Sequence, residues 1–131
     1  MIVSLLVVDD EPDVVELFRQ RFRRELRSGT YVLHFAASGR EALAIIAEGV
    51  QPELLMILSD INMPEMDGFE LLREVKRRWP GLPVIMITAY SDDDRRRLAD
   101  EIGAADFLNK PIDFDHLKQR IEAFVPEGPR A

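Results

Sequence analysis

The chain has 131 residues, of which 47% are hydrophobic and 31% are charged, and its formal net charge is −7. This length suits a single domain with a sizeable core, the absence of cysteine excludes disulfides, thiolate metal sites and thiol nucleophiles, and the acidic balance argues against nucleic acid as the direct ligand. No apolar stretch approaches the roughly 20 residues of a membrane span, and no signal peptide is visible at the N-terminus, so a soluble cytoplasmic protein is expected.

The N-terminal segment predicts a buried strand followed by a helix. Residues 2–8 form an almost unbroken apolar run that ends at Asp9 and Asp10, which places two acids at the carboxyl end of the strand. Pro12 suits the first turn of a helix, where its missing N–H costs nothing. Apolar residues then recur at helical spacing, and they are Val14, Phe18, Phe22 and Leu26. We therefore predict one helix over residues 12–28, with an arginine-rich solvated face.

A second strand–helix pair and a third strand follow. Residues 31–36 have a strand pattern, and Ser38 and Glu41 have the spacing of a capping box at the start of the next helix. Residues 54–58 form a short apolar run typical of a strand that is covered on both faces. Asp60 comes directly after this strand, so a carboxylate is expected where the strand ends.

The second half of the chain continues the alternation. Its predicted strands cover residues 83–88 and 104–108, and its predicted helices are capped by Asp67, Ser91 and Asp113. The helix over residues 92–102 has the weakest apolar pattern, and its runs of acids and arginines predict a solvated face with pairs three and four residues apart. Residues 126–131 are predicted to be a frayed tail, which leaves one domain over residues 1–125.

The alternation of five strands with five helices predicts the fold class. Such a pattern gives an α/β fold with a parallel sheet and helices on both faces, because crossovers between parallel strands are right-handed. At this size the common arrangement is the flavodoxin-like doubly wound sheet with strand order 2-1-3-4-5. Ligands of such sheets bind outside the carboxyl ends of the strands, at the point where the strand order reverses.

Five polar residues finish the predicted strands and should meet at one edge of the sheet. Asp9 and Asp10 end the first strand and Asp60 the third, and these strands are neighbours in the expected order. Three crowded carboxylates repel one another, and Mg²⁺ is a suitable counter-ion because it binds carboxylates and leaves room for a phosphate oxygen. Thr88 and Lys110 add a hydroxyl and a cation at the ends of the last two strands. The set suits phosphoryl transfer to an aspartate.

Four segments at these strand ends carry a family resemblance. They are Val7-Val8-Asp9-Asp10-Glu11-Pro12, Asp60-Ile61-Asn62-Met63-Pro64-Glu65-Met66-Asp67-Gly68, Thr88-Ala89 and Lys110-Pro111. Each segment is weak evidence alone, but four in this order, each at a predicted strand end, are specific. Along essentially its whole length the chain resembles the CheY-like receiver domain of response regulators in two-component signalling.

The resemblance implies a role for each acidic residue. Asp60 would accept a phosphoryl group from the phosphohistidine of a sensor histidine kinase or a phosphotransfer protein. Asp10, Asp60 and the backbone carbonyl of Asn62 would bind Mg²⁺ directly, and Asp9 would do so largely through water. The chain would then be a signalling phosphoacceptor and not an enzyme with its own substrate.

The resemblance also implies which residues transmit phosphorylation to a partner-binding surface. Thr88 and Lys110 would bind the phosphoryl oxygens, and the peptide bond before Pro111 would be cis. Phe107 stands at the position of the family's switch aromatic, although it lacks the hydroxyl of the frequent tyrosine there. The surface that responds would be the helix over residues 92–102, the last strand and the last helix. Its expected partner is an effector protein or an output domain, and a homodimer stays open.

Two other classes of protein compete with this interpretation. A Mg²⁺-dependent phosphohydrolase with an aspartyl nucleophile, like the haloacid-dehalogenase-like enzymes, would carry its two acids two residues apart on the first strand and would have a cap domain. Here Asp9 and Asp10 are adjacent and no cap segment is visible. A flavodoxin-like cofactor carrier would need a phosphate-binding loop after the first strand, where these acids would repel a phosphate.

Overall fold

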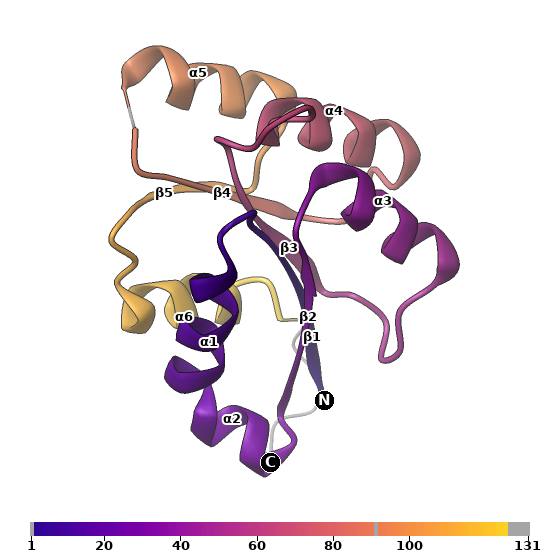
Figure 1. The fold of residues 1–131 in the computed structure, drawn as a ribbon, viewed down its shortest axis with the longest axis vertical. Helices are drawn as coiled ribbons and strands as arrows, with labels where there is room; N and C mark the ends of the chain where they lie inside the picture. The colour runs from indigo at the N-terminus through magenta and orange to yellow at the C-terminus, as the bar shows by residue number, and fades with distance from the viewer. Residues whose placement is uncertain (1, 91, 126–131) are drawn as a thin grey trace.

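The protein folds into a five-stranded parallel sheet with helices on both faces (Figure 1). The computed structural model describes residues 2–90 and 92–125. The strands lie in the order β2-β1-β3-β4-β5, which confirms the predicted flavodoxin-like arrangement. The strands are β1 (Val3–Val8), β2 (Tyr31–Ala36), β3 (Met56–Asp60), β4 (Val84–Thr88) and β5 (Asp106–Asn109).

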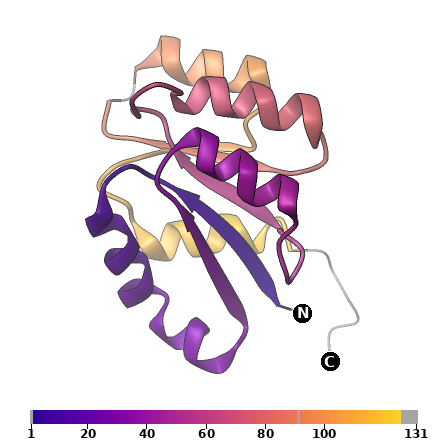
Figure 2. The same cartoon turned by 45° about the vertical axis from the view of Figure 1, so that its right-hand side comes forward.

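The helices cover the sheet as two layers. The described part of the chain has α1 (Pro12–Arg21), α2 (Arg23–Ser28), α3 (Gly39–Glu48), α4 (Gly68–Arg78), α5 (Asp93–Ile102) and α6 (Phe114–Glu122). Figures 1 and 2 show α3, α4 and α5 on one face and α1, α2 and α6 on the other. Each layer has its own apolar core, one around Ile57, Leu72 and Met86 and the other around Leu58 and Leu117. Within the described residues, no helix is long and apolar enough to cross a membrane.

The first predicted helix is divided into α1 and α2, so the described chain has six helices where five were predicted. Phe22 lies at the junction with φ −103° and ψ 16°, and it is fully buried. In a continuous helix the carbonyl of Arg21 would accept from the N–H of Glu25. Here Lys118 Nζ on α6 donates to that carbonyl at 2.8 Å. A side chain that enters the helical hydrogen-bond ladder bends the helix, which explains the break.

β3 and β5 begin two residues later than predicted, and β1 and β4 begin one residue later. β3 starts at Met56 instead of residue 54, and Asp60 is its last residue, paired with Ile87 of β4. β5 starts at Asp106 because Gly103 ends α5 in a left-handed conformation and the next residue still bonds back to that helix, N–H of Ala104 to O of Ala99 at 2.9 Å. The later starts leave the carboxyl ends of the strands, and therefore the expected site, in place.

Carboxylate and hydroxyl caps start most of the helices at the same edge of the sheet. Ser38, Asp67 and Asp113 accept from backbone N–H groups three residues later, and Asp67 forms a full capping box with Glu70. Asp92 caps α5, since its Oδ1 accepts from the N–H of Arg95 at 2.7 Å. The predicted cap Ser91 and the predicted tail over residues 126–131 lie outside the described residues.

Candidate acidic phosphotransfer site

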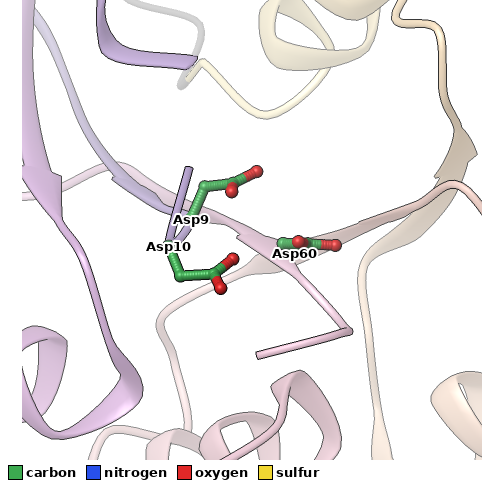
Figure 3. A group of neighbouring side chains, drawn as sticks. All are labelled: Asp9, Asp10 and Asp60. Atoms are coloured by element: carbon green, nitrogen blue, oxygen red, sulfur yellow. The ribbon is translucent and has the colours of Figure 1, made fainter. Parts of the chain in front are cut away.

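Three carboxylates meet at the carboxyl ends of β1 and β3. One oxygen from each of Asp9, Asp10 and Asp60 lies within 4.8 Å of the other two. Figure 3 shows Asp9 and Asp10 extending from the end of β1 toward the same side as Asp60. Their surroundings differ, because Asp60 is only 7% exposed whereas Asp10 is open to solvent. The structure therefore brings together the three acids that the sequence placed at separate strand ends.

Lys110 lies against this acidic group from the end of β5. Its Nζ is 3.1 Å from Asp9 Oδ2 and 3.5 Å from Asp60 Oδ2. The backbone N–H of Lys110 donates to the carbonyl of Thr88 at 2.8 Å, and the bond between Lys110 and Pro111 is cis. One ammonium group beside three carboxylates leaves two negative charges at the site. A divalent cation would neutralise that remainder.

Burial and neighbouring charges shift the proton affinities of the two central groups. Burial, followed by the charge of Asp9, raises the pKa of Asp60, and the charge of Lys110 opposes that rise. Burial lowers the pKa of Lys110, but the hydrogen bond and charge of Asp9 and the charge of Asp60 outweigh it, so the pKa of Lys110 is raised. Lys110 therefore stays protonated, and the ionised form of Asp60 is less favourable in the folded protein than in the unfolded chain.

The donor set fits a hard divalent cation. Carboxylate and carbonyl oxygens are the ligands that Mg²⁺ takes, usually one or two carboxylates together with water. Asp10 and Asp60 offer such carboxylates, and the backbone of Asn62 lies beside them because its N–H donates to Asp60 Oδ1 at 3.4 Å. Asp9 already pairs with Lys110, so it would contact the metal through a water molecule.

Thr88 lies fully buried at the end of β4, beside the acidic group. Its Oγ1 accepts from the backbone N–H of Tyr90 at 3.1 Å and from Nδ2 of Asn62 at 3.4 Å. The hydroxyl is therefore within the loop network that surrounds Asp60, where the sequence placed it.

Phe107 lies apart from the acidic group. It pairs with Met86 in the sheet, whereas Thr88 pairs with Asn109 two residues further along. The ring is 6% exposed, and the guanidinium of Arg96 lies over it at 4.9 Å from its centroid. The aromatic is thus already packed inward under α5.

The close approach of α4 to β3 depends on Gly68. A Cβ atom at this position would lie 2.4 Å from the carbonyl oxygen of Asp60 and 2.7 Å from Cα of Ile61. The Gly68 N–H donates to the carbonyl of Ile61 at 2.8 Å. Only glycine fits there without moving the backbone that carries Asp60.

Sequence reasoning missed Arg95. It was predicted to lie on a solvated face, and the exposed pairs of Arg95 with Asp92 at 4.0 Å and of Arg97 with Asp94 at 3.6 Å do form. However, NH1 of Arg95 also donates to Oδ1 of Asn62 at 3.3 Å, which connects α5 to the site. In a run of three arginines, residue type and spacing alone give no signal that separates this one from its neighbours.

Comparison with known proteins agrees with this geometry. The family model of the response regulator receiver domain matches residues 5–122. The chain belongs to this family. It is therefore a receiver domain of response regulators in two-component systems, a class of signalling domain that uses Mg²⁺ at its acidic pocket.

Two relatives of this receiver domain differ in length. The transcriptional regulatory protein ZraR of Escherichia coli is 38% identical over 92% of the chain, but the match covers 26% of ZraR, so the chain spans about a quarter of that relative. An uncharacterized 14.6 kDa protein of Leptolyngbya boryana is 40% identical over 96% of the chain and 95% of its own length.

Solved receiver structures share the whole fold. The receiver domain protein of Clostridium thermocellum has a TM-score of 0.83 and 28% identity, with 94% of each chain covered. Chemotaxis protein CheY4 of Vibrio cholerae has a TM-score of 0.80 and 28% identity over 95% of this chain and 100% of its own. The sheet order and helix layers described above are therefore those of known receivers.

Proposed function

We propose that Asp60 is the phosphoryl acceptor of this receiver. The observation that supports it best is the set of contacts around its carboxylate: Oδ1 accepts from the N–H of Asn62 at 3.4 Å, and Oδ2 faces the ammonium of Lys110 at 3.5 Å. The Asp60 side chain is buried, as is that of Asp9, whereas Asp10 is exposed, and Asp60 alone of the three lies between the ammonium of Lys110 and the backbone donor of Asn62. Asp9 and Asp10 line the same space from β1.

The proposed donor is the phosphohistidine of a sensor histidine kinase or of a phosphotransfer protein. A carboxylate oxygen of Asp60 forms a bond to phosphorus as the bond from phosphorus to the imidazole nitrogen breaks, and the electron pair stays on that nitrogen. Transfer of this kind needs positioning and charge neutralisation more than covalent help from the protein. The chain then acts as a phosphoacceptor and has no separate substrate.

The surrounding residues receive the transferred group. Lys110 exchanges its contact with Asp60 for a phosphoryl oxygen, and Thr88 donates its hydroxyl to another. Asp10, Asp60 and the carbonyl of Asn62 would hold Mg²⁺, with Asp9 contacting it through water. When bound, the metal supplies positive charge against the carboxylates and the phosphoryl oxygens.

A cavity beside the site suits the approach of the donor. It has a volume of about 390 Å³ and lies between α1 and the segment after β5, with Asp9, Asp60 and Lys110 in its lining. Leu17, one of the exposed large apolar side chains at 37%, also lines it. An apolar wall next to the acceptor would dock a helix that carries the phosphohistidine.

The proposed response surface consists of α5, β5 and α6. Thr88 ends β4 before α5, and Lys110 directly follows β5 before α6, so contacts with a phosphoryl group act on the segments that lead into both helices. The partner would be an effector protein or an output domain. The ZraR-like relatives, named as transcriptional regulators, have most of their length outside the match, whereas the Leptolyngbya protein does not. We propose one receiver domain over residues 1–125 in either setting.

Mass spectrometry tests the acceptor directly. With Mg²⁺ and acetyl phosphate, the intact mass should rise by one phosphoryl group, and Asp60→Asn should abolish the increase because an amide is a poor nucleophile. Undiminished phosphorylation of that variant would refute the assignment. Steady release of phosphate from a generic phosphomonoester would instead support the phosphohydrolase alternative.

A further inference from the structure

Arg95 is part of a closed ring of hydrogen bonds around the end of β4. Its NH1 group donates to Oδ1 of Asn62 at 3.3 Å and to the carbonyl of Tyr90 at 3.4 Å. The ring closes because Nδ2 of Asn62 and the N–H of Tyr90 both donate to Oγ1 of Thr88, at 3.4 and 3.1 Å. It joins the loop after β3, the end of β4 and the first turn of α5.

The chemistry of the groups sets the direction of each bond in the ring. A guanidinium can only donate, so it takes the amide oxygen of Asn62 and leaves the amide N–H groups for Thr88. The Thr88 hydroxyl accepts two bonds, and it donates a long hydrogen bond to the carbonyl of Tyr90, with 3.5 Å between the two oxygen atoms. Its acceptor sites are therefore used and its proton has a partner within the ring, so donation to a phosphoryl group on Asp60 competes with the ring.

The two arginines that follow have other contacts. Arg96 lies over the ring of Phe107. Arg97 pairs with Asp94 at 3.6 Å, and both of these side chains are largely exposed. Arg95 has a side chain that is only 36% exposed, and of the three it alone bonds to a residue beside Asp60. The contact therefore depends on this position and is no general property of the arginine run.

We infer that Arg95 is a positioning residue that holds the Thr88 hydroxyl in its resting orientation through the amide of Asn62. It thereby opposes the contact between Thr88 and a phosphoryl group, and that contact in turn releases the first turn of α5 from the site. The inference rests on the proposed function of Asp60 and Thr88. A side chain of α5 would then help to set the concentration of phosphoryl mimic at which the protein responds.

Titration with beryllofluoride, a phosphoryl mimic, tests this role. Wild type, Arg95→Gln and Arg97→Gln would be saturated with Mg²⁺ and followed by the amide NMR signals of Asn62 and Thr88. Loss of the two hydrogen bonds that Arg95 makes in the ring, which compete with the response, should lower the half-response concentration of Arg95→Gln by about threefold to tenfold. Arg97→Gln removes the same charge from the same helix and should behave like wild type.

The other results separate the alternatives. A higher half-response concentration for Arg95→Gln would show that Arg95 binds the phosphoryl group itself, and this would overturn the inference. If wild type and Arg95→Gln responded at the same concentration of beryllofluoride, the inference about Arg95 would be wrong and the proposed function would stand. If wild type gave no response, the proposed function would be wrong as well. In a Thr88→Ala background, followed by the signal of Asn62, Arg95→Gln should have no effect. A persistent effect there would show that Arg95 acts elsewhere.

Discussion

The ammonium group of Lys110 lies 3.1 Å from a carboxylate oxygen of Asp9, so the ends of β5 and β1 are joined by an ion pair across the ends of β3 and β4. This pair and the weaker contact of Lys110 with Asp60 offset part of the repulsion among the three acids. The remaining two negative charges would favour the binding of a divalent cation. Binding and stability measurements can therefore test the site before any phosphoryl donor is known.

Asp10→Ala should weaken the binding of Mg²⁺ by about tenfold or more, because it removes a proposed direct ligand. The metal-free variant should be as stable as wild type or more stable, since one of three like charges is lost. Calorimetry would measure the affinity. At a Mg²⁺ concentration 100 times the wild-type dissociation constant, wild type should gain about 2.7 kcal/mol in the free energy of unfolding, and the variant should gain less.

Asp13→Asn is the matched control for this change. It removes one negative charge from the first turn of α1, outside the acidic group. Its affinity for Mg²⁺ should stay close to that of wild type. If Asp10→Ala and Asp13→Asn had the same effect, the result would reflect long-range charge and the ligand role of Asp10 would be refuted.

Asp60→Asn should stabilise the metal-free protein at neutral pH. Burial and the charge of Asp9 raise the pKa of Asp60 above its ordinary value of 3.8, so the folded state binds this proton more tightly than the unfolded chain does. The free energy of unfolding therefore falls as the pH rises from 3.8 through the raised pKa, and the loss is complete above it. Denaturant unfolding of both proteins across this range would measure the difference, which should vanish below the ordinary pKa. A variant that is less stable at neutral pH would show that Lys110 outweighs burial.

Lys118→Met should lower the free energy of unfolding by about 1–2 kcal/mol, because it removes a charged hydrogen bond while keeping the apolar stem. Lys118 donates to the carbonyl of Arg21 and pairs with Glu25 at 3.0 Å. Burial raises the pKa of Glu25, but its hydrogen bond with Lys118 contributes to a net lowering below 4.5. The stabilisation by Glu25 is therefore present above pH 4.5 and is lost as the pH falls through the lowered pKa.

A double-mutant cycle with Glu25→Gln separates these contributions. Coupling between Lys118 and Glu25 should disappear in acid, where Glu25 is protonated, whereas the bond to the Arg21 carbonyl should persist. If Lys118→Met had no effect on stability at neutral pH, the proposed cause of the break between α1 and α2 would be wrong.

Sequence reasoning succeeded where neighbouring residues carry the signal. The carboxyl ends of β1, β3 and β4 could be located because an apolar run ends there in a polar residue, at Asp9, Asp60 and Thr88. The strand order then followed from the alternation of strands with helices, and the acids converge because parallel strands end at one edge. No measurement of distance was needed to expect the acidic group.

Sequence reasoning failed where a local feature is determined by a residue far away along the chain. The apolar spacing runs unchanged through Phe22, and the side chain that interrupts the helix there, Lys118, lies 97 residues from the carbonyl it binds. The contact of Arg95 with Asn62 spans 33 residues in the same way. Both are hydrogen bonds from a long cationic side chain, in one case to a backbone carbonyl and in the other to a side-chain amide, and their partners are set by the packing of α6 and α5 and not by local pattern.

Gly68→Ala should destabilise the protein by about 1–3 kcal/mol, because overpacking forces the backbone to move. The new methyl group would meet the carbonyl of Asp60 at 2.4 Å, so the change should also weaken Mg²⁺ binding. Gly81→Ala is the control, since a Cβ there meets nothing within 4 Å. Thermal unfolding and calorimetry would measure both effects. If the two variants were equally stable, the close approach of α4 to β3 would not constrain the site.

The conformational response to phosphorylation should be concentrated in residues 89–106 and around Phe107. Thr88 and Lys110 end β4 and β5, and α5 lies between these strands in the chain with Arg95 bonded to the site and Arg96 over Phe107. Because Phe107 is already buried, its surroundings should change through the shift of Arg96 and α5 more than through entry of the ring itself. A ligand can shift such an equilibrium only by its different affinity for the two states.

Amide hydrogen exchange with and without beryllofluoride would map this response. Thr88→Ala should still be phosphorylated at Asp60, because it keeps the acceptor and the acids, but the exchange difference over residues 89–106 should be smaller than in wild type. The helices α1 and α2 should change little, since they lie on the face of the sheet opposite α5 (Figure 1). Changes confined to α1, α2 and α3, with α5 and β5 silent, would move the output surface to the arginine-rich side of the molecule.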